Sequence, residues 1–408
     1  MTSPALDLWR PSALALAVAI YGTFSQPAPS GLGPAEVLIA ALLVAAIGPR
    51  HGFAFATGLL LRAPSPYRLE TTGAVTFVLL LWVPLVRGAG LGWEADDILR
   101  DVVPLGFLFL PALLLRPLEA QRHVAAAVLA AGLAVAGVAF TVRWWADAQW
   151  GFGAVGVRAM GDGLSYWLNS PTVLFAALGL PFAGFAAWSR RTVTGALIGV
   201  VCAVAAALCI AALAGAVHRV ALVFVALAFA AFVICWLRRE PVLLAVMLLA
   251  VGAVVLAVPG PVLGTVEQVI AKSRLVGANA RPAEVMAVFE QVTRSPLALL
   301  VGDGWGALVA NPAVGQWRVS YTHSFFSYML LKTGFLGCFA MAAYLSHLMA
   351  SAVALARRPA WAVAVLPPVF IGLALHTSFK FLCFGLLLTL MVLLEGAVES
   401  DRESRQKA

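Results

Sequence analysis

The sequence has few charged residues: only 11% of its 408 residues are Asp, Glu, Lys or Arg, whereas 62% are hydrophobic. A soluble globular protein contains about 25% charged and about 45–50% apolar residues. A soluble chain of this length would lack the polar residues that its surface needs, so the shortage excludes that class. The composition predicts instead an all-α, polytopic membrane protein.

Metal-binding and nucleic-acid-binding patterns are also missing. The five cysteines lie inside apolar runs without C-x-x-C or zinc-type spacing, and the six histidines form no group with ligand spacing, which argues against a metal site. The net charge of +8 comes from arginines scattered over short loops, so we expect no nucleic-acid partner. No small-residue cleavage site follows the first apolar run, and we interpret that run as a retained span.

Long apolar runs predict about twelve transmembrane helices, because about 17–25 apolar residues are enough to cross a bilayer. The predicted spans are 11–26, 33–48, 70–86, 99–115, 122–141, 166–188, 193–214, 219–237, 241–258, 335–356, 360–377 and 380–397. The shorter apolar piece 52–61 is either an in-plane segment or an extension of a neighbouring span. Since no internal repeat or linker is visible, we expect residues 1–408 to form a single integral membrane domain.

Loops rich in arginine alternate with loops that contain little of it. One side carries Arg50, Arg62, Arg68, Arg116, Arg122, Arg190, Arg191, Arg238, Arg239, Arg357 and Arg358, together with Arg402, Arg405 and Lys407 of the tail. The positive-inside rule makes this side cytoplasmic and places both termini there. The longest loop on the opposite, external side is 259–323.

A short helix is predicted within this external loop at 282–294. Pro282 suits the first helical position, and Glu284 suits the positive amino-terminal end of a helix. The apolar face of this helix is expected to consist of Val285, Val288, Phe289 and Val292. The glycine-rich turn 302–306 is flexible backbone that suits the close approach of a ligand.

His323 ends the external loop, where the chain returns to an apolar run. One interpretation is a histidine that is hydrogen-bonded at a helix start, with Thr322 or Ser320 as the cap. The other is a general base, because a histidine pKa of about 6.5 lets the ring accept a proton. The residue taken alone favours neither interpretation.

Several cations are expected on the external side, which the orientation rule normally leaves poor in them. Arg219 lies at the outer edge of a predicted span, as either a snorkelling arginine or a cation that faces the external loops. The others are Arg158, Lys272, Arg274, Arg281, Arg294 and Arg318. Pairing with Glu267, Glu284, Glu290 and Asp303 explains some of them. The alternative is an anion site, since arginine offers phosphate a planar, permanently charged fork.

Three acidic residues, Glu94, Asp96 and Asp97, lie in another external loop. Their spacing suits coordination of Mg²⁺ or Mn²⁺. Acidic residues at such a place more often cap the next helix and complement its dipole, and we favour that role.

The order of these motifs resembles a known family. His323-Ser324 followed by nine residues and Gly334 is similar to the histidine motif of the O-antigen ligase and O-antigen polymerase superfamily. Arg281, the helix after it, Pro296 and residues 301–306 look like the rest of that family's periplasmic loop. Residues 214–219 resemble its arginine at the start of a span, although His218 stands where serine is common.

This resemblance implies a membrane glycosyltransferase of the GT-C type in the bacterial inner membrane, with no metal or cofactor. Such an enzyme takes a glycan from undecaprenyl diphosphate at the periplasmic face, with inversion. A ligase transfers the glycan to lipid A–core, a polymerase to another carrier-linked repeat, and a protein-glycosylating relative to Ser or Thr. Carried over from the family, His323 activates the acceptor hydroxyl while Arg219 and Arg281 bind the diphosphate. Arg158, Lys272 and Arg274 are then weaker candidates for substrate binding.

A transporter or flippase for lipid-linked sugars is the alternative from another class. It should have ionisable residues deep within its spans and helices that break at mid-membrane. The predicted spans are nearly free of charge, and Lys332 and Lys380 lie near span ends. This pattern favours chemistry at the membrane surface over passage through it.

Overall fold

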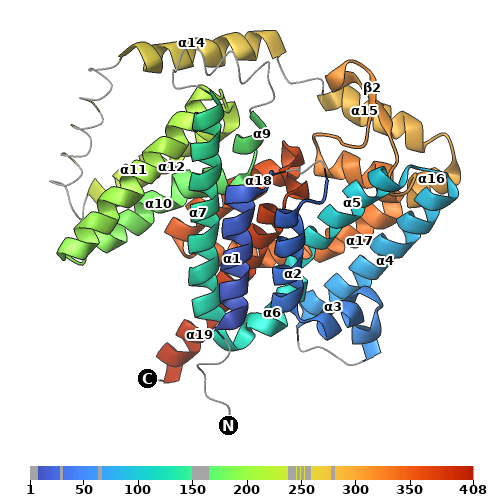
Figure 1. Ribbon diagram of the computed structural model, residues 1–408, viewed down its shortest axis with the longest axis horizontal. Helices are drawn as coiled ribbons and strands as arrows, with labels where there is room; N and C mark the ends of the chain where they lie inside the picture. The colour runs from blue at the N-terminus through green and yellow to red at the C-terminus, as the bar shows by residue number, and fades with distance from the viewer. Residues whose placement is uncertain are drawn as a thin grey trace. The chain divides into compact units, whose positions relative to one another are not determined.

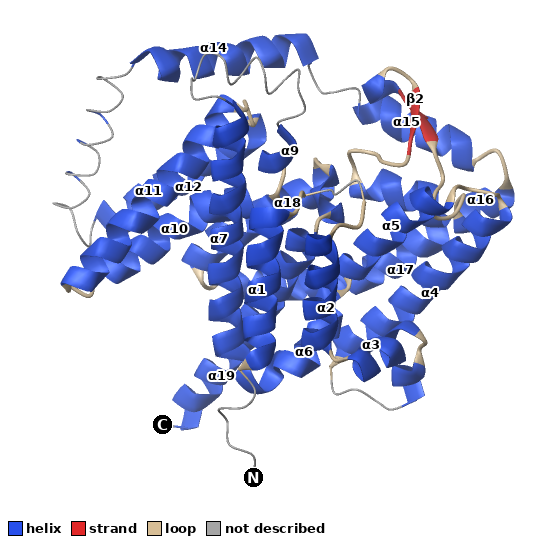
Figure 2. Cartoon of the chain, in the orientation of Figure 1, coloured by secondary structure: helices blue, strands red, loops and turns tan. Residues whose placement is uncertain are grey.

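The computed structural model describes residues 8–27, 31–62, 67–148, 165–237, 259–276 and 281–407, together with three isolated positions between 237 and 259. The chain divides into two compact units. The first consists of Met1–Ala136 and Asn279–Ala408, and the second is Gly137–Ala278. The described residues are helical apart from connecting loops and one small sheet (Figure 2). The all-α fold class therefore agrees with the sequence.

The first unit brings together both ends of the chain. Its helices before the unit boundary are α1 (Trp9–Phe24), α2 (Pro34–Ile47), α3 (Pro49–Ala56), η2 (Leu59–Arg62), α4 (Arg68–Gly90), α5 (Ala95–Leu108), α6 (Leu110–Leu118), η3 (Glu119–Gln121) and the first part of α7 (Arg122–Ala148). Its later helices are α15 (Arg281–Val292), α16 (Pro296–Val301), η4 (Pro312–Val314), α17 (Phe325–Leu355), α18 (Pro359–Ala374), η5 (Thr377–Lys380) and α19 (Leu382–Lys407). Within this unit, α3 and α6 lie at the end opposite to α15 and the sheet (Figure 1).

The sheet is a hairpin that the sequence did not predict. Strand β1 (Val309–Asn311) pairs antiparallel with β2 (Trp317–Val319), so that Val309 lies opposite Val319. Each strand has only three residues, which is too short for an alternating apolar pattern to stand out.

The described residues of the second unit form the end of α7 and five further helices. They are α9 (Ser165–Leu168), α10 (Pro171–Trp188), α11 (Val193–Gly215), α12 (Arg219–Leu237) and α14 (Pro259–Val276). Helices α10 and α11 approach closely where Gly184 meets Gly199, since a methyl group on Gly184 would lie 3.1 Å from the Gly199 carbonyl oxygen. Small residues permit this kind of backbone contact between membrane helices.

Five helices among the described residues are long and apolar enough to cross a membrane, or six if α2 and α3 form one broken span. These segments confirm the membrane class, while the count of twelve spans stays a prediction. The predicted span 241–258 lies outside the described residues apart from isolated positions. The short piece predicted at 52–61 corresponds to α3 and η2, and α3 bends by 88° away from α2.

Three other predicted spans meet a break in the observed helices. The span 166–188 is divided at Asn169 and Ser170 into α9 and α10. The span 99–115 is divided at Phe109 into α5 and α6. The span predicted to begin at 335 is the later part of α17, which begins at Phe325 and is interrupted at Gly334 (φ 60°, ψ −165°). Only glycine adopts this backbone conformation without large strain.

The glycine-rich turn 302–306 packs against backbone on both sides. Pro84 has no N–H, so the carbonyl of Leu80 in α4 lacks its usual helical donor. The indole N–H of Trp305 donates to that carbonyl at 2.8 Å. On the other side, the turn bonds to α17 next to its interruption at Gly334. The N–H of Asp303 donates to the carbonyl of Leu331 at 2.9 Å, and the N–H of Gly304 donates to the carbonyl of Lys332 at 3.1 Å.

These contacts correct the interpretation of the turn as a place for a ligand. A methyl group on Gly304 would lie 2.3 Å from the nitrogen of Gly88, and one on Gly302 would lie 2.4 Å from the carbonyl carbon of Lys332. The glycines are needed because α4 and α17 approach the turn this closely. The turn therefore fixes the segment 296–323 onto two helices.

Candidate functional site

The site centres on a hydrogen-bonded pair formed by Glu284 and His323. The ring Nδ1 of His323 lies 3.2 Å from Oε1 of Glu284, and the backbone N–H of His323 donates to Oε2 at 3.0 Å. The Glu284 side chain is 1% exposed, whereas that of His323 is 28% exposed. The pair thus joins a buried carboxylate to an imidazole that reaches the surface.

Helix α15 positions Glu284 through its buried face. Glu284, Val288 and Val292 are spaced four residues apart, so they form one row along the helix, and all three are buried. This row corrects the predicted apolar face, because Phe289 lies on a different row and is 43% exposed. A glutamate occupies the first position of the buried row, where His323 meets it.

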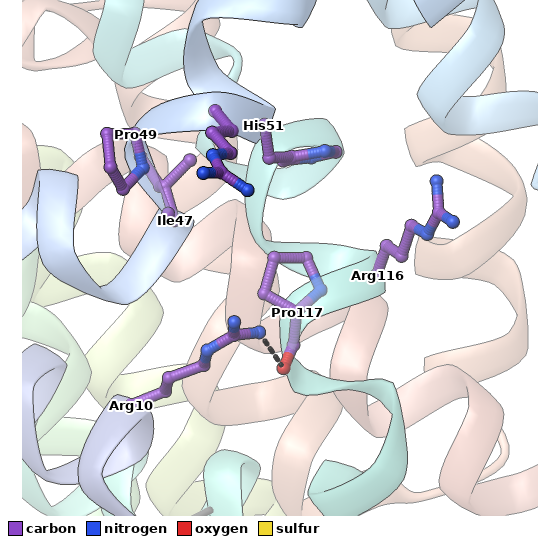
Figure 3. Close-up of a pocket in the computed structure, with 8 residues that line it drawn as sticks. Arg10, Ile47, Pro49, His51, Arg116 and Pro117 are labelled. Atoms are coloured by element: carbon purple, nitrogen blue, oxygen red, sulfur yellow. Dashed lines mark hydrogen bonds between the residues drawn. The ribbon is translucent and has the colours of Figure 1, made fainter.

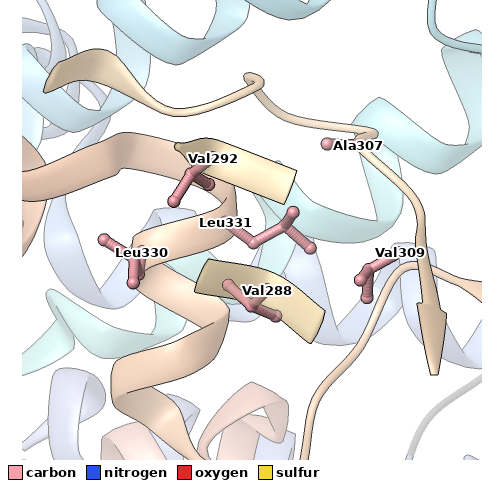
Figure 4. Close-up of a cluster of buried hydrophobic side chains, with 6 residues drawn as sticks. All are labelled: Val288, Val292, Ala307, Val309, Leu330 and Leu331. Carbon is pink, nitrogen blue, oxygen red and sulfur yellow. The ribbon is translucent and has the colours of Figure 1, made fainter. Parts of the chain in front are cut away.

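An apolar cluster holds α15 against α17, which begins directly after His323. Its members are Val288, Val292, Ala307, Val309, Leu330 and Leu331 (Figure 4). They come from α15, the chain leading into the hairpin, β1 and α17. Burying such side chains stabilises the fold by about 1.5–3 kcal/mol each. The cluster therefore fixes the helix that carries Glu284 relative to the start of α17.

The hairpin supplies a third donor to the carboxylate. The side-chain N–H of Asn311, at the end of β1, donates to Oε1 of Glu284. The Asn311 amide oxygen in turn accepts from the backbone N–H of Ala313 at 2.8 Å, which fixes the orientation of the amide. A buried carboxylate needs such donors, since an uncompensated charge in the interior is costly.

The protonation of the pair follows from these contacts. Burial raises the pKa of the Glu284 carboxyl, but hydrogen bonds from the ring and backbone of His323 and from Asn311 outweigh it and hold the pKa below its usual value. An ionised Glu284 accepts a hydrogen bond from the Nδ1–H of His323, and in that tautomer Nε2 carries the lone pair of the imidazole. Nε2 makes no hydrogen bond to any residue that the structure describes. An imidazole held in this tautomer can accept a proton from an incoming hydroxyl.

A second buried group, the Asp101 cluster, ties residues 306 and 307 to the neighbouring helices. It consists of Asp101 of α5, Tyr328 and Lys332 of α17, and Lys380 of η5. Asp101 and Lys332 are fully buried.

Four groups donate to the Asp101 carboxylate. The Lys332 ammonium and the backbone N–H of Gly306 meet Oδ2, the latter at 2.9 Å. Oδ1 accepts from the hydroxyl of Tyr328 at 2.9 Å and from the Lys380 ammonium at 3.1 Å. Two lysines and one aspartate leave a surplus of positive charge. The Lys380 ammonium also lies 3.4 Å from the carbonyl of Ser320, three residues before His323.

Of the predicted diphosphate-binding arginines, Arg281 lies near the pair. It begins α15 one helical turn before Glu284, and its guanidinium donates to the carbonyl of Leu375, at the end of α18, at 2.9 Å. Two of the predicted site residues, His323 and Arg281, are therefore joined through α15 and Glu284.

The other cations predicted to bind the substrate belong to the second unit. Arg219 begins α12 directly after a tight turn, in which Val217 has a left-handed conformation with φ 54°. A β-branched residue in this conformation is strained. Arg274 lies in the last turn of α14 and is exposed. The side chain of Lys272 and the whole of Arg158 lie outside the described residues.

Several of the other charged residues predicted for the external side have local partners. Arg318 lies over the ring of Trp93 with 5.7 Å to its centroid, and the Asp303 carboxylate accepts from Gln291 at 2.8 Å. The acidic residues 94–97 belong to the start of α5, where Asp96 and Asp97 occupy the first turn and Asp97 pairs with Arg100 at 3.5 Å. This arrangement matches the helix-start role. In the described ranges no three His, Cys, Asp or Glu side chains gather as metal ligands.

Sequence reasoning missed four residues of the site: Glu284 as the partner of His323, Asn311, and the ion pair of Asp101 with Lys332. Asp101 carried a usable signal, because it is an acidic residue inside the predicted span 99–115 and therefore requires a buried partner. Asn311 carried none, since its role depends on the hairpin.

Comparison of the chain with family models, with curated proteins and with solved structures finds no match.

Proposed function

We propose that this protein is an O-antigen ligase-like glycosyltransferase that transfers a glycan from undecaprenyl diphosphate to an acceptor hydroxyl at the periplasmic face of the inner membrane. The Glu284–His323 pair is the observation that carries the proposal. The buried carboxylate of Glu284 orients the imidazole of His323, and the second ring nitrogen remains available for a substrate. General-base catalysis by histidine uses this arrangement. The proposed acceptor is lipid A–core. A polymerase of the same superfamily differs in its acceptor and uses the same chemistry.

In the proposed reaction, Nε2 of His323 takes the proton of the acceptor hydroxyl as its oxygen attacks the anomeric carbon. The bond between that carbon and the diphosphate oxygen breaks, and its electron pair leaves with undecaprenyl diphosphate. Attack from the face opposite the leaving group inverts the configuration. Glu284 stabilises the imidazolium that forms, because its charge lies 3.2 Å from Nδ1.

The leaving diphosphate gains negative charge as its bond to the sugar breaks. Fixed cations stabilise such a charge when they are already in position. Arg281, one turn from Glu284, and Lys380, next to the chain that leads to His323, are the nearby cations of the first unit. Arg219 is proposed for the same role. Arg274, Lys272 and Arg158 remain weaker candidates for donor binding.

Complementation of a deletion strain tests this proposal. Wild-type protein should restore glycan attached to lipid A–core, as judged by lipopolysaccharide banding, whereas His323→Ala should not. His347→Ala is the matched control, because His347 bonds to Thr72 within the helices, away from the external loop. Full transfer by His323→Ala at wild-type protein levels would contradict the proposal. Core with a single repeat in the deletion strain would indicate the polymerase.

A lipid-linked-sugar transporter is the second candidate, and specific features favour it. The bend between α2 and α3, the interruption of α17 at Gly334 and the buried Asp101 cluster are the breaks and buried charges expected of a transporter. The cluster, however, bonds to the base of the external loop through Gly306 and Ala307, which favours a role in holding that loop. Movement of labelled carrier lipid across reconstituted vesicles, without glycan transfer, would favour the transporter.

A further inference from the structure

A cavity of about 630 Å³ lies between α1, α3 and α6, at the end of the first unit opposite the Glu284–His323 pair. Three arginines line it: Arg10 of α1, Arg50 of α3 and Arg116 of α6 (Figure 3). His51 and the backbone carbonyl of Pro117 also lie in the wall. None of the described residues that line the cavity is acidic. Permanent positive charge from three separate helices therefore surrounds one cavity.

These arginines have little else to bind. Arg10 donates from Nη1 to the carbonyl of Pro117 at 3.1 Å, while its Nε is buried and has no hydrogen-bond partner among the described residues. Arg50 and Arg116 form no ion pair with any acidic residue that the structure describes. The carboxylate of Glu70 faces His51 instead, at 3.7 Å. Glu70 is the one carboxylate that the described residues place next to a lining residue, so the three arginines around the cavity exceed the negative charge beside it.

The bend between α2 and α3 makes room for the cavity. Gly48 has φ 91°, a conformation open to glycine, and Pro49 then starts α3 at 88° to α2. The positive-inside rule explains why arginines lie on this side, but it does not require three of them to surround one cavity. Guanidinium groups around a cavity suit the oxygens of a phosphate group.

Apolar side chains lie on the same two helices and are exposed. Val44 of α2 is 51% exposed and Phe53 of α3 is 65% exposed. A lipid combines the two features, since its phosphate matches the arginines and its acyl chains match the apolar faces. Basic pockets on the cytoplasmic side of membrane helices are suited to anionic lipid headgroups. We propose that this cavity, the arginine cavity, binds the phosphate of an anionic phospholipid, with the acyl chains along α2 and α3.

Binding of short-chain lipids to the purified full-length protein tests this inference. Dioctanoyl phosphatidylglycerol should bind at least about tenfold more tightly than dioctanoyl phosphatidylcholine, because only the former has a net negative headgroup. Arg10→Gln and Arg116→Gln should each weaken binding of phosphatidylglycerol about tenfold and leave that of phosphatidylcholine unchanged. Arg357→Gln is the control, since Arg357 is an exposed arginine predicted for the same side that does not line the cavity.

Three outcomes would overturn the inference. Equal affinity for the two lipids would remove the role of the headgroup charge. An equal loss in Arg357→Gln would indicate diffuse attraction to the surface. Inorganic phosphate that displaces the lipid at the same concentration would assign the cavity to a soluble phosphate compound. If Arg10→Gln does not fold, the inference is still tested by Arg116→Gln, at an exposed position, and by the affinities of the wild-type protein for the two lipids. None of these measurements depends on glycan transfer.

Discussion

Glu284 accepts hydrogen bonds from both the ring and the backbone of His323, which lies 39 residues further along the chain. One carboxylate therefore fixes the position of the residue and the orientation of its imidazole. Glu284 also belongs to the buried row of α15, and the other members of that row pack against α17. Stability of the loop and reactivity of His323 thus depend on one ionised group.

The stability of the protein should depend on pH through Glu284. Its pKa is lower in the folded protein than the ordinary value of about 4.3, so its ionised form stabilises the fold above that ordinary value. This contribution is lost as the pH falls through the lowered folded pKa. We expect the thermal midpoint of Glu284→Gln to lie below that of wild type at pH 7, and the difference to shrink at pH 4 and below. A difference that grows with acidity would contradict an ionised Glu284.

Asp101→Asn should destabilise the protein strongly, because it leaves two lysine ammonium groups without their counter-charge, one of them fully buried. Breaking a buried ion pair in this way costs about 3–5 kcal/mol. The loss in the double variant with Lys332→Met should be smaller than the sum of the single losses by about 0.5–3 kcal/mol. Equilibrium unfolding in mixed micelles measures these values. Asp96→Asn is the control, because Asp96 is an exposed residue in the first turn of the same helix, and this change should cost under about 1 kcal/mol.

Gly334→Ala should also be destabilising, for steric reasons. The backbone there has φ 60° and ψ −165°, and a methyl group would lie 2.5 Å from the carbonyl oxygen of Leu300. Backbone strain of about 1–3 kcal/mol and overpacking of a similar size are expected together. Gly106→Ala in α5 is the control, because a methyl group there meets nothing within 4 Å. Equal stability of the two variants would remove the proposed reason for glycine at 334.

Arg281→Gln should slow glycan transfer at least about tenfold, if its charge stabilises the leaving diphosphate. Arg294→Gln is the matched control, since Arg294 is exposed and lies just after the other end of the same helix. Initial rates at saturating donor separate this effect from weaker binding. Equal rates in the two variants would exclude Arg281 from the reaction.

Many helices could be predicted because an apolar run long enough to cross a bilayer, about 17–25 residues, forms a helix there. The predicted helix 282–294 nearly coincides with α15, since Pro282 and Pro296 mark its ends. Its buried face could not be predicted fully, because Glu284 is buried only through partners on the hairpin and at the start of α17. A prediction from apolar residues alone placed Phe289, which is exposed, in the buried face and left out Glu284, which is buried.

Motif spacing predicted a joint role for His323 and Arg281, and the structure places both at α15, one through Glu284 and one at the first residue of the helix. Their role in a reaction stays a prediction. Motif spacing did not identify Asn311 or the pairing of Asp101 with Lys332, because these contacts join residues 27 and more than 200 positions apart. The glycine-rich turn shows the same limit. The glycines indicate that another group lies close to the backbone of the turn. The fold shows that this group is the backbone of α4 and α17.

The rate of glycan transfer by the purified protein in liposomes, with an undecaprenyl-diphosphate-linked donor, tests the role of the Glu284–His323 pair most directly. His323→Ala and Glu284→Gln should each lower the rate about 10²-fold or more, because the first removes the base and the second removes the charge that orients it and stabilises its imidazolium. Glu290→Gln, an exposed residue of the same helix, should retain the wild-type rate. Wild-type rates in folded His323→Ala and Glu284→Gln would contradict the account.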